Sequence, residues 1–234
     1  MLKYLKFLYF IFYRPKIFFP KKSYSLFQED LFIKKYFKNK TKGFYIDIGC
    51  YHPLDGNNTH LLYAKGWKGM NLDINSYSIE MFNFLRKKDI NIHSGISNKK
   101  EKLVMYYRKE INMLNTLDKN IAKIHFRNGF KKRNVQVNTL NYFIFKYFKK
   151  LIKIDFLNID VEGVELNVLK SLNFKQYNPQ LICIEIHNSK NMYDTNYDYL
   201  KSNSIYKYLI NKKYKVVWKK KYSFIFERKY DKKN

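Results

Sequence analysis

The chain has 234 residues and two cysteines, and its 46 Lys+Arg against 19 Asp+Glu give a formal net charge of +27. This length suits one α/β domain with a sizeable core. Two isolated cysteines argue against a disulfide framework or a cysteine metal cluster, so Cys50 and Cys183 are predicted to be buried thiols. The charge fits nucleic acid, anionic lipid or an acidic glycan, but biased nucleotide composition also produces it, so charge alone identifies no ligand.

Residues 1–40 are predicted to be a basic, apolar and helical extension that precedes a domain over residues 41–234. The longest uncharged run at the amino terminus, 7–13, is much shorter than the ~20 residues of a spanning helix, and no small-residue cleavage site follows it. Residues 1–22 therefore either pack on the domain or rest on an anionic membrane surface. We expect a cytoplasmic protein, peripheral at the membrane in the second case.

Short apolar runs and helical patterns alternate from residue 43 onward. In the first half, the patterns predict strands at 43–49, 67–74 and 90–97, a hairpin partner at 101–108, and helices at 58–66 and 76–88. We expect Asn57 or Asn58 to cap the first helix, Gly66 to end it, and Ser76 to cap the second. Trp67 is predicted to anchor the core, and residues 109–134 to be loop with a short helix.

The second half continues the alternation and ends in two neighbouring strands. Its patterns predict a strand that runs into a helix at 134–148, strands at 154–160 and 179–187, helices at 161–172 and 197–213, and an antiparallel pair at 214–219 and 222–228. This order predicts a Rossmann-like α/β fold: a mainly parallel sheet with helices on both faces and an antiparallel carboxyl-terminal edge. Ligands of such sheets bind at the carboxyl ends of the strands.

Acidic residues stand at or beside the carboxyl ends of four predicted strands: Asp47, Asp73, Asp160 and Glu185. A buried carboxylate is costly unless a partner hydrogen-bonds or neutralises it. Because parallel strands bring their carboxyl ends to one edge of the sheet, the four are predicted to form a site. The alternative is that they cap the helices that follow.

The first two of these acids predict a nucleoside site. Asp47-Ile48-Gly49-Cys50 forms a strand-to-turn element with one glycine for close approach, and Asp73 can accept hydrogen bonds from both hydroxyls of a ribose. The signature G-x-G-x-x-G is missing, and residues 51–53 (Tyr-His-Pro) would crowd a pyrophosphate. A phosphate-free nucleoside such as S-adenosylmethionine therefore fits, with Asp47 near its amino-acid tail and residues 96–97 near adenine. The predicted cofactor-binding residues are Asp47, Gly49, Cys50, His52, Asp73, Ile74, Ser97 and Asp160.

Five stretches in this order resemble the FkbM-type family of S-adenosylmethionine-dependent methyltransferases. They are "FYIDIGCYHPLDGNNTHLLYAKGWKGMNLDIN", "LNTL" at 114–117, "VNTLNYF" at 137–143, "FLNIDVEGVELNVLKSLNF" at 156–174 and "PQLICIEI" at 179–186. The resemblance covers most of residues 23–228. It implies a class I methyltransferase fold and, most often, O-methylation of a sugar or a related hydroxyl.

The chain departs from the family pattern at two places. The leader element of the family usually reads S-Q-x-G-E-D, whereas here Leu26 and Gln28 replace its Gln and Gly, although Ser25 and residues 29–30 (Glu-Asp) match. Residues 74–75 (Ile-Asn) follow Asp73 where the family often has a proline. The first departure weakens a role for the leader, and the second alters only a turn.

A sugar hydroxyl is a weak nucleophile, so methyl transfer to it should be helped by a general base or a metal ion. Either His187 is the base, steered by a carboxylate, or Asp160 and Glu185 hold a divalent cation such as Mg²⁺. Asn115 and Glu162 are predicted to contact the acceptor. The alternatives are that Glu162 caps a helix, that His187 is a loop residue and that Asn115 belongs to an ordinary turn.

Two other functions compete with a glycan O-methyltransferase. A nucleic-acid methyltransferase would use the basic surface, but Asp-Val-Glu-Gly at 160–163 stands where base methylation motifs of the N-P-P-Y type would be. A non-catalytic cofactor-binding or scaffold domain would sit at the membrane through residues 1–22. Acceptor specificity is expected to depend on residues 105–134 and 187–197.

Overall fold

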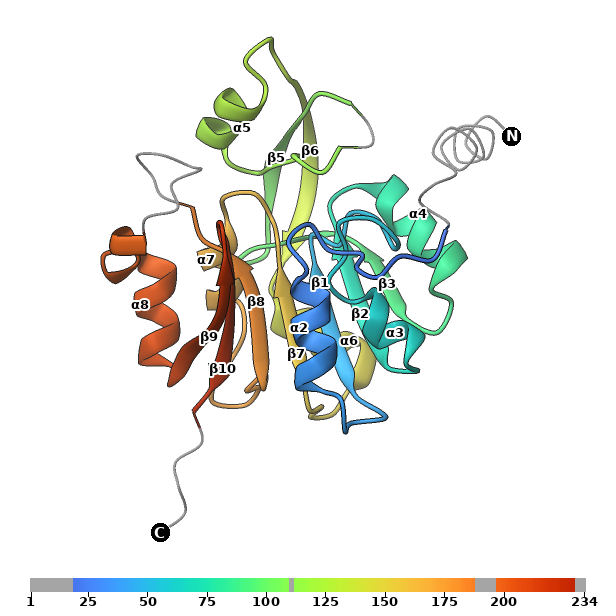
Figure 1. The fold of residues 1–234 in the computed structure, drawn as a ribbon. Coiled ribbons are helices and arrows are strands. Elements are labelled where there is room, and N and C mark those ends of the chain that lie inside the picture. Colours follow the sequence, from blue (N-terminus) through green and yellow to red (C-terminus); the bar gives the residue numbers. More distant parts are fainter. Residues whose placement is uncertain (1–18, 110–111, 188–196, 230–234) are drawn as a thin grey trace.

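A seven-stranded sheet organises the chain (Figure 1), and the computed structural model describes residues 19–109, 112–187 and 197–229. The order of its strands is β3-β2-β1-β7-β8-β10-β9. The first five are parallel, and β10 is antiparallel to both of its neighbours. This confirms the predicted α/β sheet with an antiparallel carboxyl-terminal edge. The strands are β1 (Phe44–Ile48), β2 (Lys68–Asp73), β3 (Ile90–His93), β7 (Phe156–Ile159), β8 (Leu181–Glu185), β9 (Tyr214–Lys220) and β10 (Ser223–Arg228).

Helices cover both faces of this sheet because alternate strand residues are apolar toward each face. In β1, Ile46 and Ile48 face one core, which also contains side chains of α6 (Leu140–Phe148), α7 (Glu165–Lys170) and α8 (Ser204–Asn211). Tyr45 points to the opposite core, against α2 (Glu29–Tyr36), α3 (His60–Ala64) and the buried Trp67. Trp67 is 1% exposed, which confirms the predicted core anchor.

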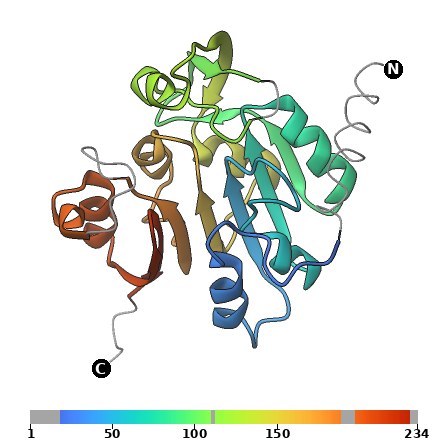
Figure 2. The same ribbon diagram turned by 45° about the horizontal axis from the view of Figure 1, so that its top comes forward.

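A second, three-stranded sheet stands over the carboxyl ends of the parallel strands (Figures 1 and 2). It contains β4 (Gly95–Ile96), β5 (Glu101–Tyr107) and β6 (Lys131–Asn138), with α5 (Lys119–His125) beside it. The predicted single strand at 90–97 is therefore wrong, because the chain leaves the main sheet after His93 and continues as β4. Residues 101–108 also pair with β6 rather than with the preceding strand.

Several predicted helices are shorter in the structure. The helix expected at 161–172 is only α7, because Glu162 (φ 55°) and Gly163 (φ 108°) are left-handed and cannot continue a right-handed helix. The helix expected at 197–213 is divided into η2 (Tyr197–Lys201) and α8, which Asn203 caps through Ile205 N.

The predicted helix caps also need correction. Asn75, rather than Ser76, caps α4 (Ser76–Leu85) by accepting from Tyr77 N. The residue before α3 is Thr59, which makes no side-chain cap, so neither Asn57 nor Asn58 has the predicted role. Gly66 has φ 95°, as expected for the residue that ends α3.

The leader segment folds onto the domain ahead of α2. Asp30 accepts from Ser23 Oγ and Tyr24 N, both at 2.6 Å, and Gln28 adopts a left-handed conformation with φ 72°. Both cysteines are buried and free, as predicted. In the described ranges, no helix has the length and apolar character that crossing a bilayer requires. Residues 1–18, which carry most of the predicted membrane contact, lie outside those ranges.

Candidate active site

The sheet reverses its strand order between β1 and β7, and the loops after these strands touch. An added Cβ on Gly49 (φ 75°) would lie 1.6 Å from the backbone oxygen of Asp160, so only glycine fits there. Asp160 N in turn donates to Ile48 O at 2.9 Å. In α/β sheets, this switch point is where ligands bind.

A cavity opens at the switch point, with about 490 Å³ of space between the atoms, part of it open to solvent. Asp73, at the end of β2, accepts from Asn75 N at 2.7 Å and Tyr51 N at 2.9 Å, and burial raises its pKa to about 6. Asn115 is 8% exposed and its Oδ1 has no hydrogen-bond partner within the described part of the chain. The wall consists of Ile48, Gly49, Tyr51, Leu72, Asp73, Ile74, Ser94, Gly95, Ile96, Asn112, Met113, Asn115, Leu117, Asp160, Val161 and Val164.

Four predicted cofactor residues do not reach this wall: Asp47, Cys50, His52 and Ser97. His52 is buried and its Nδ1 accepts from Leu54 N at 3.1 Å. Ser97 is buried and donates to Glu101 Oε1 at 3.2 Å. The structure thus brings Gly49, Asp73, Ile74 and Asp160 together at the cavity, and it adds Asn115, which was predicted to contact the acceptor.

Asp47 lies inside the protein, on the face of the sheet that α2 and α3 cover. Its carboxylate accepts from Asn158 Nδ2 and Thr59 Oγ1, both at 2.8 Å. Burial raises the pKa of Asp47, and these bonds together with the charge of Arg86 counteract the rise. Asp47 is therefore a buried, hydrogen-bonded acid rather than a wall residue.

Arg86, the residue that follows α4, is 1% exposed. Its Nη1 donates to Thr59 Oγ1 at 2.7 Å, and its Nη2 donates to Asn57 Oδ1 at 2.6 Å and Pro53 O at 2.8 Å. A basic residue after an amphipathic helix gives no sign of such burial. Arg86 fixes the loop that follows β1 and supplies the positive charge near Asp47.

A wider groove adjoins the cavity, and Asp160 and Met113 line both. The groove encloses about 1350 Å³ of space between the atoms, including open solvent. Three predicted site residues, Glu162, Glu185 and His187, line it together. Its other lining residues are Leu26, Arg108, Leu114, Ile124, His125, Arg127, Asn128 and Tyr222.

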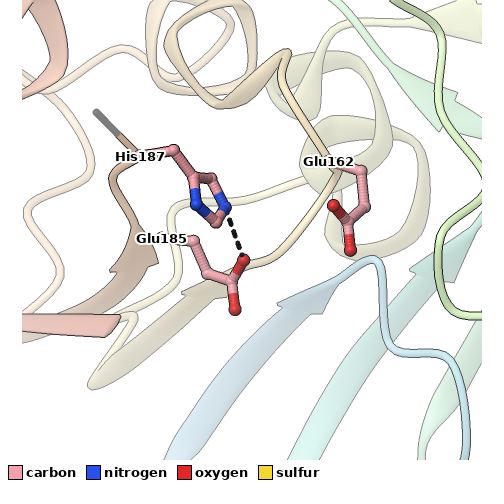
Figure 3. A group of neighbouring side chains, drawn as sticks. All are labelled: Glu162, Glu185 and His187. Carbon is pink, nitrogen blue, oxygen red and sulfur yellow. Dashed lines mark hydrogen bonds and ion pairs between the residues drawn. The ribbon is translucent and has the colours of Figure 1, made fainter. Parts of the chain in front are cut away.

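Glu162, Glu185 and His187 face one another across this groove (Figure 3). Glu185 ends β8, His187 follows two residues later, and Glu162 belongs to the turn before α7. His187 Nε2 lies 3.1 Å from Glu185 Oε2, and the ring of Tyr222 lies 4.6 Å from the His187 ring. His187 and Glu185, which were both predicted to act in catalysis, therefore lie within hydrogen-bond distance of each other.

The carboxyl groups of the groove resist ionisation. Burial and the charge of Glu185 hold the pKa of Asp160 well above its usual range. Burial and the charge of Asp160 raise the pKa of Glu162 to about 9, and burial with the charge of Glu162 raises that of Glu185. Perturbed acids around one groove are typical of sites that transfer protons or bind cations.

The arrangement suits a nucleoside in the cavity and a polar molecule in the groove. Asp73 keeps lone pairs for hydroxyl donors, Asn115 Oδ1 is an unused buried acceptor, and the cavity wall contains no lysine or arginine among the described residues. The wall therefore offers no side-chain cation to a phosphate, which fits the phosphate-free nucleoside expected from the sequence.

The comparison with protein families gives one match. The family model described as the methyltransferase FkbM domain matches residues 47–214. No curated protein matches the sequence. The matched range begins in β1 and ends at the first residue of β9, so it includes every wall residue of the cavity.

Proposed function

The chain belongs to the FkbM methyltransferase family, and on that premise we propose that it is an S-adenosylmethionine-dependent O-methyltransferase that acts on a hydroxyl of a sugar or glycan. The observation that carries this proposal is the position of Asp160. Asp160 lines the cavity at the switch point and also the groove that holds His187 and Glu185. A donor and an acceptor that met at Asp160 would have the proximity that methyl transfer needs.

The cavity supports the donor half of the proposal. Bound S-adenosylmethionine would supply a methyl group on a sulfonium sulfur. Asp73 would accept hydrogen bonds from the ribose hydroxyls while it keeps its bonds to Tyr51 N and Asn75 N. Gly49 lets the loops after β1 and β7 approach each other at the switch point, which is where ligands of such sheets bind.

The groove supports the acceptor half of the proposal. A sugar hydroxyl is a weak nucleophile, so a group must take its proton as the new C–O bond forms. Glu185 Oε2 lies 3.1 Å from His187 Nε2 and would orient the ring through that nitrogen, so the other ring nitrogen, Nδ1, would take the proton. Polar walls that include Arg108, Arg127 and the acids suit a ligand rich in hydroxyl groups. A divalent cation held by these groups is the second way to activate the hydroxyl.

The test is methyl transfer from radiolabelled S-adenosylmethionine to a panel of extracted glycans and, separately, to RNA. We expect label in a glycan, with turnover reduced about 10²–10⁴-fold in His187→Gln, the usual range for loss of a general base. His93→Gln is the matched control, since His93 is exposed and lies outside both cavities. Label in RNA alone, or equal turnover in both variants, would overturn the proposal.

A further inference from the structure

The acids of the groove lack cationic partners although the chain as a whole is strongly basic. Asp160, Glu162 and Glu185 form no ion pair with a lysine or arginine among the residues that the structure describes. Within the described ranges, their only ion-pair contacts are those of Glu162 with His125 and of Glu185 with His187. Like charges held this close repel one another unless protons or a cation neutralise them.

Three side chains at this place present a set of ligand atoms suited to a metal ion. One atom each from Glu162, Glu185 and His187 lies within 4.8 Å of the other two. Figure 3 shows the two carboxylates and the ring around a shared space. Carboxylate oxygen together with imidazole nitrogen is the ligand combination of Mn²⁺, Fe²⁺ and Zn²⁺ sites, whereas Mg²⁺ prefers oxygen alone.

His125 is a further buried group beside the three proposed ligands, and within the described part of the chain it has an unused ring nitrogen. Its side chain is 6% exposed, its Nε2 lies 3.6 Å from Glu162 Oε2, and its Nδ1 has no hydrogen-bond partner within the described ranges. A buried imidazole beside a ligating carboxylate has the position of an outer-shell partner of a metal ligand.

The backbone also holds Glu162 in position at a cost. Glu162 has φ 55°, a conformation that side-chain-bearing residues avoid, and Thr116 Oγ1 donates to its backbone oxygen at 2.6 Å. Gly163 follows with φ 108°. Strain of this kind persists where the surrounding structure fixes a functional side chain.

We propose that Glu162, Glu185 and His187 bind one divalent cation of the class that takes both oxygen and nitrogen ligands, represented by Mn²⁺. The site differs from the sequence prediction, which assigned Asp160 and Glu185 to Mg²⁺. Asp160 stays outside the ligand set and faces the donor cavity. The further role of the ion, to bind the acceptor hydroxyl, rests on the proposed function.

The direct test titrates the metal-free full chain with Mn²⁺ and follows free Mn²⁺ by electron paramagnetic resonance. We expect one ion per chain, and binding weakened at least about tenfold in Glu162→Gln and in Glu185→Gln. Glu80→Gln, on α4, is the matched control and should bind as the wild type does. Absence of binding to the wild type, or equal binding by all variants, would overturn the proposal.

Thermal unfolding separates loss of the site from loss of the fold. Without metal, Glu185→Gln should unfold at a higher temperature than the wild type, because it removes like-charge repulsion. Mn²⁺ should raise the unfolding temperature of the wild type and leave that of the variant unchanged. A variant that Mn²⁺ stabilises as much as the wild type would contradict the assigned ligands.

Calorimetry with S-adenosylmethionine keeps this proposal distinct from the proposed function. Mn²⁺ binding without cofactor binding would support the ion site and overturn the proposed function. Cofactor binding without Mn²⁺ binding would support the donor half of the proposed function and overturn the ion site. Methyl transfer that persists in excess EDTA would overturn the role of the ion in the reaction and leave His187 as the base.

Discussion

The acidic residues at the carboxyl edge of the sheet have many polar partners in one half of that edge and few in the other. Beside β1 and β2, Asp47 and Asp73 each accept two or more hydrogen bonds, and Arg86 supplies a charge. Beside β7 and β8, the carboxyl group of Asp160 forms no hydrogen bond among the described residues, and the only ion-pair contact of Glu162 in those ranges is with His125. The acids of the first half are hydrogen-bonded within the protein and shape the donor cavity. Those of the second half have no lysine or arginine partner among the described residues and are placed to bind a ligand.

The largest effect is expected where the two halves touch. Gly49→Ala would force a Cβ to within 1.6 Å of a backbone oxygen, which no side-chain movement relieves. We expect a loss of more than about 4 kcal/mol in the free energy of unfolding. Gly66→Ala is the control, because Gly66 is also left-handed but has open space around it, and it should cost about 1–2 kcal/mol. Urea unfolding measures the free energy of unfolding of both variants. Equal losses would contradict the close contact between Gly49 and the backbone oxygen of Asp160.

Removal of one charge from each half should give changes of opposite sign. Arg86→Met leaves Asp47 buried without a cation and should cost roughly 3 kcal/mol in the free energy of unfolding. Asp160→Asn removes repulsion from the other half and should stabilise the metal-free protein. The same unfolding assay in EDTA compares them. If both variants were destabilised alike, the contrast between the halves would be wrong.

The acids beside β7 and β8 should also make the free energy of unfolding depend on pH. The pKa of Glu162 is raised from 4.5 to about 9, so the folded state binds more protons than the unfolded state between these values. The metal-free protein should therefore lose stability as pH rises from 6 to 8, by about 1 kcal/mol per pH unit from this group. In Glu162→Gln the slope should be shallower, and in Glu80→Gln unchanged. An identical slope in all three proteins would contradict the raised pKa.

The smallest effect concerns Gln28 of the leader segment, which lines neither the cavity nor the groove. Gln28 adopts φ 72° where the family resemblance places a glycine. Gln28→Gly removes the left-handed strain and should stabilise the fold by about 1 kcal/mol. Gln180→Gly, at a residue without a positive φ, should not stabilise it. A melting temperature that falls in Gln28→Gly would show that the side chain matters more than the strain.

The sequence predicts the parallel sheet and its acidic strand ends well, because burial leaves a local pattern in each strand. It does not predict which sheet a strand joins, so residues 90–97 were assigned to one strand although β4 pairs with β6. Arg86 and His125 were missed for a related reason. Their partners lie far away in the sequence, and no local spacing marks a buried base.

The site residues show the same difference between what a local pattern predicts and what depends on contacts between distant residues. Asp73 and Glu185 were found because they end strands, and Asp160 because it directly follows one. The grouping of Glu162 with Glu185 and His187 depends on a left-handed turn that the pattern of residues 161–172 had suggested to be helix. Backbone conformation therefore decides which acids meet.

The most direct test of the proposed function is calorimetric titration of the wild type and of Asp73→Asn with S-adenosylmethionine. We expect one binding site per chain and an affinity at least about tenfold lower in the variant, the loss expected for a charged hydrogen bond to the ribose. A wild type that binds no S-adenosylmethionine, or a folded Asp73→Asn that binds it as tightly as the wild type, would contradict the donor site at Asp73.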